Sequence, residues 1–213
     1  MHTPSRRSPL TLLALGVMAA VVAVAGSADS SRSASAAASA GRTSGDIHEI
    51  DFASVAQPGV TCADAVDDHA PRAIAVSGGV SDVLDRLTLA RLRVDPAVVY
   101  GDLDDDGDDE AIVRTSCTFG ANGAEESVQV WASAGRLPIL VDTVTGAPRR
   151  VADDSRFPPT VADVAVDGDD LAVTFEVWAQ DDPHCCPTQQ AVVRYALDGD
   201  LEVDGRPRVG PAA

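Results

Sequence analysis

The chain of 213 residues contains no lysine, so all 16 of its basic residues are arginine. Acidic residues number 33, which gives a formal net charge of −17. A surface this acidic repels phosphate backbones and anionic lipids, so we expect no nucleic acid partner and no peripheral membrane binding by the mature domain. The charge suits divalent cations or basic partners, and solubility is its simplest explanation.

Aromatic residues and catalytic motifs are also scarce. The chain has two Trp, two Tyr and four Phe, and we expect Trp131, Phe175, Trp178 and Tyr195 in or beside the core. It lacks the G-x-S-x-G, H-E-x-x-H and G-x-G-x-x-G patterns. The sequence therefore predicts no catalytic residue. It does not exclude an enzyme, because a glycosidase needs only two carboxylates.

The N-terminal residues have the pattern of an export signal. Arg6 and Arg7 precede an uncharged apolar run over residues 10–25, and small residues follow it. We expect a signal peptide over residues 1–28, a disordered Ser/Ala/Gly-rich linker over 29–46, and a β-rich domain over 47–213. The protein would then be secreted or extracytoplasmic, and an uncleaved N-terminal anchor is the alternative.

The rest of the chain alternates apolar and polar residues with period two. In Leu171–Val177 every second residue is large and apolar, and Asp167-Gly168 before it can form a hairpin turn. Asp198-Gly199 and Asp204-Gly205 are further turn signals. Residues 82–92 show some helical spacing and can equally be a strand. We predict a mostly β, antiparallel domain, sandwich or barrel-like, with about eight to ten strands.

Six Asp and one Glu crowd residues 102–110. The acids at alternate positions have the spacing of a calcium loop, with Gly107 at the bend and position 7 offering its backbone carbonyl. An EF-hand would need Glu at position 12, where this chain has Val113. We predict a structural calcium site, and the alternative is a merely solvated hairpin. The predicted ligands are Asp102, Asp104, Asp106, Asp108 and Glu110.

The four cysteines are Cys62, Cys117, Cys185 and Cys186. Adjacent Cα atoms lie about 3.8 Å apart, below the roughly 4.4 Å minimum of a relaxed disulfide. We therefore expect each of the two neighbours to bond one distant cysteine, in either of two arrangements. Metal binding by His184-Cys185-Cys186 is the alternative, but an exported chain without CxxC spacing favours disulfides.

The segments "VVYGDLDDDGDDEAIVRTSC" and "DDPHCCPT" resemble those of uncharacterised exported actinobacterial proteins and are similar to the LppP/LprE lipoprotein family. The acidic loop itself resembles the calcium loops of FG-GAP repeats. It occurs once, so we expect the loop without the β-propeller that such repeats build. The family resemblance implies an envelope compartment and no established activity.

Three functions agree with these features. The first is a secreted or cell-envelope, calcium-stabilised β domain that binds or scaffolds an unknown envelope or extracellular component. The second is a secreted hydrolase of a cell-wall or extracellular polymer. The third is an inhibitor of another exported protein, which would need a rigid loop near Cys185.

Overall fold

The computed structural model describes residues 46–62, 73–120 and 123–212. The expected signal peptide and almost all of the expected linker lie outside the described residues. The described part contains twelve strands in three antiparallel sheets that do not close into a barrel. The predicted mostly β class is thus confirmed, with more strands than expected, because several of them have only two residues.

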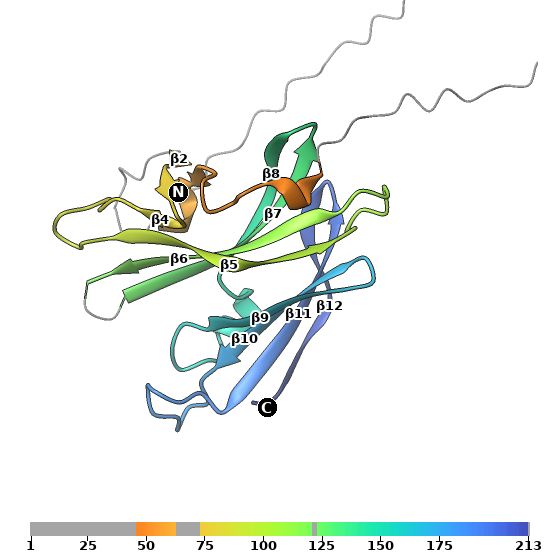
Figure 1. Cartoon of the computed structure of the whole chain (residues 1–213). Helices are drawn as coiled ribbons and strands as arrows, with labels where there is room; N and C mark the ends of the chain where they lie inside the picture. The colour runs from red at the N-terminus through yellow and green to blue at the C-terminus, as the bar shows by residue number, and fades with distance from the viewer. Residues whose placement is uncertain (1–45, 63–72, 121–122, 213) are drawn as a thin grey trace, which may run out of the picture. The chain divides into compact units, whose positions relative to one another are not determined.

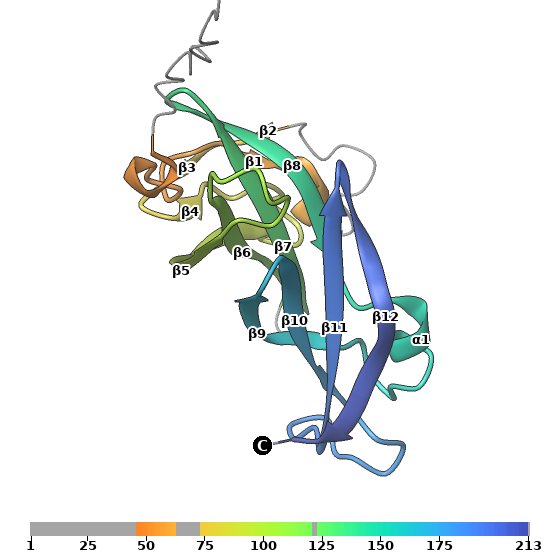
Figure 2. The same cartoon turned by 90° about the vertical axis from the view of Figure 1, so that its right-hand side faces the viewer.

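The largest sheet has six strands in the order β3-β4-β5-β6-β7-β8. The second sheet, seen in Figure 2, has four strands in the order β12-β11-β10-β9. The six strands are Val76–Ser77, Val80–Ser81, Arg91–Gly101, Glu110–Phe119, Gly123–Ala134 and Leu137–Thr145. Strands β9 to β12 are Thr160–Asp167, Asp170–Val177, Gln189–Asp198 and Asp200–Pro211.

The remaining elements are short. Strands β1 (Gln57–Pro58) and β2 (Ala73–Ile74) pair with each other. The helices are the 3₁₀ turns η1 (Ile47–Glu49) and η2 (Gly59–Cys62), and the single α turn α1 (Arg149–Ala152). Helices η1 and η2 and strand β1 all belong to the N-terminal segment, residues 46–62.

The six-stranded sheet is covered on both faces (Figure 1). On one face, residues such as Ile112 and Val130 pack against Phe175 and Val193 of the four-stranded sheet. On the other face, Leu92 and Val113 pack against Ile47, Phe52 and Cys62 of the N-terminal segment, together with Ile74 of β2. The domain therefore has two cores, and the central strands contribute alternate residues to each.

A buried polar chain lies in the core beneath the N-terminal segment. The hydroxyls of Thr115 and Ser127 are 2.7 Å apart, and Gln129 donates to Thr115 over 3.2 Å. Trp131 Nε1 donates to Gln129 Oε1 over 3.0 Å. All four residues are at most 5 % exposed. These bonds satisfy polar groups that would be costly to bury alone, and they tie β6 to β7 through side chains as well as backbone.

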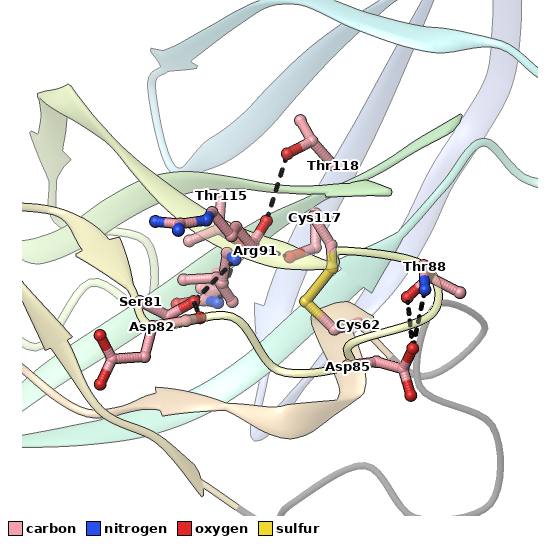
Figure 3. Close-up of a disulfide and its surroundings, with 12 residues drawn as sticks. Cys62, Ser81, Asp82, Asp85, Thr88, Arg91, Thr115, Cys117 and Thr118 are labelled. Carbon is pink, nitrogen blue, oxygen red and sulfur yellow. Dashed lines mark hydrogen bonds between the residues drawn. A yellow bond between two sulfur atoms is a disulfide. The ribbon is translucent and has the colours of Figure 1, made fainter. Parts of the chain in front are cut away.

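A disulfide between Cys62 and Cys117 joins the N-terminal segment to β6 (Figure 3). Both cysteines are fully buried and their Cα atoms lie 5.3 Å apart. The bond closes a sequence separation of 55 residues, which stabilises the fold by about 4 kcal/mol in the chain-entropy model. The covering segment is therefore covalently held to the sheet that it covers.

The second disulfide joins Cys185 to Cys186 and corrects the expectation that neither of them bonds its neighbour. Both lie in the exposed β10–β11 loop, whereas Cys62 and Cys117 lie in the core on the far face of the other sheet. The expected distant pairings are therefore spatially separated. The value of about 4.4 Å is the lower end of the usual range and not a strict limit. Here a turn, in which Cys186 N donates to Pro183 O over 3.1 Å, directs the two neighbouring side chains together although their Cα atoms lie 3.8 Å apart.

Two of the three Asp-Gly turn signals are hairpin turns. Gly168 and Gly199 have positive φ angles of 73° and 83° in the β9–β10 and β11–β12 turns. Asp204-Gly205 is not a turn, because it lies inside β12, where the register with β11 shifts opposite Val192 and Arg194. Gly205 also has a positive φ angle, of 71°, but here that conformation forms part of a β-bulge.

Candidate metal site in the loop between β5 and β6

The acidic loop connects β5 to β6, which pair directly from Gly101 opposite Glu110. Leu103 is 2 % exposed and enters the core between the two larger sheets. Asp105 and Gly107 have positive φ angles of 56° and 90°, which curl the rest of the loop into solvent. One apolar residue thus anchors a loop whose other side chains, from Asp104 to Asp109, are exposed.

Three of the predicted ligands converge. Asp102, Asp104 and Asp106 each have a carboxylate oxygen that lies within 4.8 Å of those of the other two. Asp102 accepts hydrogen bonds from the backbone N–H groups of Asp106 and Gly107, at 3.1 and 3.0 Å. Asp106 N also donates to Asp104, over 3.2 Å, and the Asp106 carboxylate accepts from Asp108 N over 2.9 Å. These bonds hold the three carboxylates around one centre.

The other two predicted ligands are placed differently. The side chain of Asp108 is exposed, as expected for a residue that offers its backbone carbonyl. Glu110 is only 4 % exposed, and its Oε2 accepts from Leu103 N over 2.9 Å. Burial, together with the negative charges of Asp104, Asp106 and Asp102, raises the pKa of Glu110 to about 7 against the lowering effect of the Leu103 bond. The pKa of the buried Glu110 carboxyl thus depends on the charges of the three converging Asp side chains, of which Asp102 is half-buried and the other two are exposed.

The N-terminal segment contacts this loop through a histidine. His48 Nε2 lies 3.0 Å from Asp109 Oδ2, and the imidazole stacks on Tyr100 with a centroid distance of 4.0 Å. Burial and the charge of Asp46 raise the pKa of Tyr100. His48, Asp108, Asp109 and Ser133 line a shallow hollow beside the loop. Local sequence spacing does not predict this pair, because Asp109 lies 61 residues from His48 in the chain.

The fit of the acidic loop to a calcium ion rests on its donor set. Calcium prefers six to eight oxygen ligands in flexible geometry, and carboxylates and backbone carbonyls are its usual ones in proteins. The converging oxygens of Asp102, Asp104 and Asp106 are of this kind. Asp105 and Asp109, which are not among the predicted ligands, are not in the converging group either.

Comparison with known families gives one match. The model of the LppP/LprE lipoprotein family matches residues 145–200, which include β9, β10 and "CCPT" but not the acidic loop. No curated protein and no solved structure matches the chain. The similarity to LppP/LprE lipoproteins suggests an extracytoplasmic, envelope-associated protein of unknown function.

In residues 46–62, 73–120 and 123–212, no helix has the length and apolarity needed to cross a bilayer.

Proposed function

We propose that this protein is an envelope domain that calcium stabilises and that binds or scaffolds an extracytoplasmic component. The observation that carries the calcium part is the convergence of Asp102, Asp104 and Asp106 within 4.8 Å. In this proposal their side chains hold the ion together with the Asp108 carbonyl and the Glu110 carboxylate. The ion supplies positive charge that turns repulsion among the carboxylates into attraction to a common centre.

The stabilising role follows from where the loop lies. Its two ends are β5 and β6, and β6 carries Cys117 and contributes to both cores. Repulsion within the loop therefore acts on the ends of two central strands. Calcium that binds only the folded state adds RT ln(1 + [L]/Kd), about 1.4 kcal/mol when its concentration is tenfold above Kd. That is a useful share of the stability of a single domain.

The hydrogen bonds around His48 favour a binding role over the chemistry of a serine hydrolase. The His48–Asp109 pair and Ser133 line one hollow, and a serine hydrolase built on them would need the serine hydroxyl to face the imidazole. Instead the Ser133 hydroxyl donates to Gly135 O over 2.8 Å. The imidazole is stacked on Tyr100 and paired with Asp109, which suits a residue that packs the N-terminal segment onto the loop.

Calorimetric titration with calcium tests the site. We expect a dissociation constant on the order of 10⁻⁴–10⁻³ M, typical of extracellular modules. Asp104→Asn should weaken binding by roughly tenfold, because ligand charge sets the affinity. Asp105→Asn is the matched control: it removes the same charge one residue away, and Asn tolerates the positive φ of that position. Calcium should also raise the melting temperature of the wild type over that in chelator.

Two outcomes would contradict the calcium part of the proposal. Equal weakening by both substitutions would mean that the loop attracts cations only through its total charge. A melting temperature that millimolar calcium leaves unchanged would remove the stabilising role. Calcium-dependent hydrolysis of a cell-wall polymer by the wild type, lost in Asp104→Asn without loss of fold, would favour the enzyme instead.

A further inference from the structure

The β10–β11 loop, residues 178–188, has a rigid base and an exposed tip. At the base, the Asp182 carboxylate is 6 % exposed and accepts from Ala179 N over 2.7 Å and from Thr188 N over 2.9 Å. Arg156 donates to the carbonyls of Gln180 and Asp182, at 3.3 and 2.8 Å. These bonds hold both ends of the loop to the domain without any help from the cysteines.

An aromatic pair supports the tip. Trp178 Nε1 donates to His184 O over 3.1 Å, and Phe157 meets the Trp178 and His184 rings edge-on, at centroid distances of 6.2 and 4.6 Å. The next two residues are Cys185 and Cys186, both exposed and bonded to each other. The disulfide is thus presented to solvent on a supported turn.

The two disulfides of the domain stand in contrasting environments. Cys62–Cys117 is fully buried and restrains a long stretch of chain. Cys185–Cys186 restrains only the two residues that form it, so it removes little freedom from the unfolded chain and does little for the fold. Thiol–disulfide exchange depends on access for the attacking thiolate, and only the second bond offers that access in the folded domain.

We propose that Cys185–Cys186 is a site of thiol–disulfide exchange, and that its substrate is an extracytoplasmic dithiol protein. In the first step a thiolate of the dithiol attacks one sulfur of the pair. The Cys185–Cys186 bond breaks, a mixed disulfide forms, and the released cysteine takes up a proton. In the second step the other thiol of the partner attacks its own sulfur in the mixed disulfide. The partner leaves as a disulfide, and two electrons and two protons have moved to the cysteine pair.

The folded domain can hold the cysteine pair both as a closed disulfide and as two reduced thiols. The bonds of Asp182 and Arg156 involve no sulfur, so they hold the base of the loop whether the pair is open or closed. Exchange is thereby confined to the tip, and Cys62–Cys117 continues to hold the N-terminal segment.

The first experiment measures reduction of the native protein by dithiothreitol, followed by maleimide labelling and peptide mapping. We expect Cys185 and Cys186 to be labelled at least about tenfold faster than Cys62 and Cys117, because the buried bond opens only when the domain does. The fluorescence of Trp178 should change with the same rate, since its indole is bonded to the loop. Equal labelling of all four cysteines would overturn the proposal.

The second experiment traps the intermediate. The probe is a thioredoxin-fold oxidoreductase whose resolving cysteine is replaced by serine, which leaves a mixed disulfide with its substrate. We expect a one-to-one adduct at Cys185 or Cys186. The variant Cys185→Ser/Cys186→Ser should melt within a few degrees of the wild type and form no adduct.

Absence of an adduct with the native wild type, when the probe still traps a model disulfide, would overturn the proposal. So would an adduct at Cys62 or Cys117 in the double variant. If the variant does not fold, the labelling rates of the wild type still decide.

Discussion

Asp182 shows how one buried carboxylate holds a loop. Burial by itself would raise its pKa, but the hydrogen bonds from Thr188 and Ala179 and the charge of Arg156 outweigh it, so the pKa of Asp182 in the folded state is lowered. A group with a depressed folded-state pKa stabilises the fold above its unfolded-state value of about 3.9. This contribution disappears as the pH falls through the folded-state value.

The substitution Asp182→Asn tests this contribution. It should lower the melting temperature at pH 7, because an amide carries no charge and offers one acceptor oxygen where the carboxylate offers two. The difference from the wild type should shrink as the pH falls below the ordinary carboxyl value of about 3.9 and through the lowered pKa of Asp182, because the wild-type carboxyl then becomes neutral as well. Thermal unfolding at several pH values measures it, with the exposed neighbour Asp181→Asn as control. A difference that is constant over this pH range would show that charge is not the cause.

At the scale of elements, the contact between the two larger sheets depends on Gly101 at the end of β5. A Cβ on this residue would lie 2.7 Å from Cγ1 and 3.0 Å from Cγ2 of Val166 in β9. The absence of a side chain therefore lets β5 and β9 approach closely, directly beside the acidic loop. The loop's position relative to the core depends on this approach.

We predict that Gly101→Ala destabilises the domain by about 1–3 kcal/mol, the usual cost of overpacking. Val166→Ala alone loses some packing, but in the double variant it removes the methyl groups that clash. The double variant should therefore be more stable than the sum of the two single changes predicts. Urea denaturation of the four proteins gives the coupling energy. Additive effects would mean that the backbone moves to accommodate the new methyl group.

The strands were predictable where their residues alternate. In β10, Leu171, Val173, Phe175 and Val177 are all buried, as their period of two predicts.

Residues 82–90 instead form a turn in which Asp85 accepts from Leu87 N and Thr88 N. Asp204-Gly205 has the same local signal as the true hairpin turns. Whether Asp204-Gly205 forms a turn or a bulge depends on how β12 pairs with β11. Local sequence does not determine that pairing.

The arrangement of the candidate metal site was predictable only as far as local spacing determines it. Alternate positions brought Asp102, Asp104 and Asp106 together. The burial of Glu110 and its bond to Leu103 depend on how the loop meets the core, and the pairing of His48 with Asp109 depends on the N-terminal segment. The Cys185–Cys186 bond was not predicted, because its Cα–Cα distance of 3.8 Å lies below the usual range for disulfides.

At the scale of the whole molecule, the charge balance predicts a response to salt. Among the described residues, Arg194 forms ion pairs with Asp167 and Asp170, and His48 lies beside Asp109. With a formal charge of −17, the compact state carries net self-repulsion. Raising KCl from 0.1 to 1 M shortens the Debye length from about 10 Å to about 3 Å.

We therefore expect KCl to raise the melting temperature of the protein in chelator. If calcium binds the acidic loop as proposed, the rise should be smaller in millimolar calcium, because the bound ion would already neutralise part of the charge of the loop. Scanning calorimetry across the two salt series measures both effects. A melting temperature that falls with salt would indicate that attractive ion pairs dominate the balance.

The N-terminal segment also bears on how the domain is assembled in time. Ile47 and Phe52 pack against Leu92, Val113 and Trp131, which are made later, and Cys62 bonds a residue 55 positions further on. Synthesis runs from the N-terminus, so the N-terminal segment is made before the strands against which it packs, and its tertiary contacts are among the last to form. Contacts between residues so distant in sequence slow folding into the range of milliseconds to seconds. Until those contacts form, the apolar side chains of Ile47 and Phe52 remain exposed to other molecules.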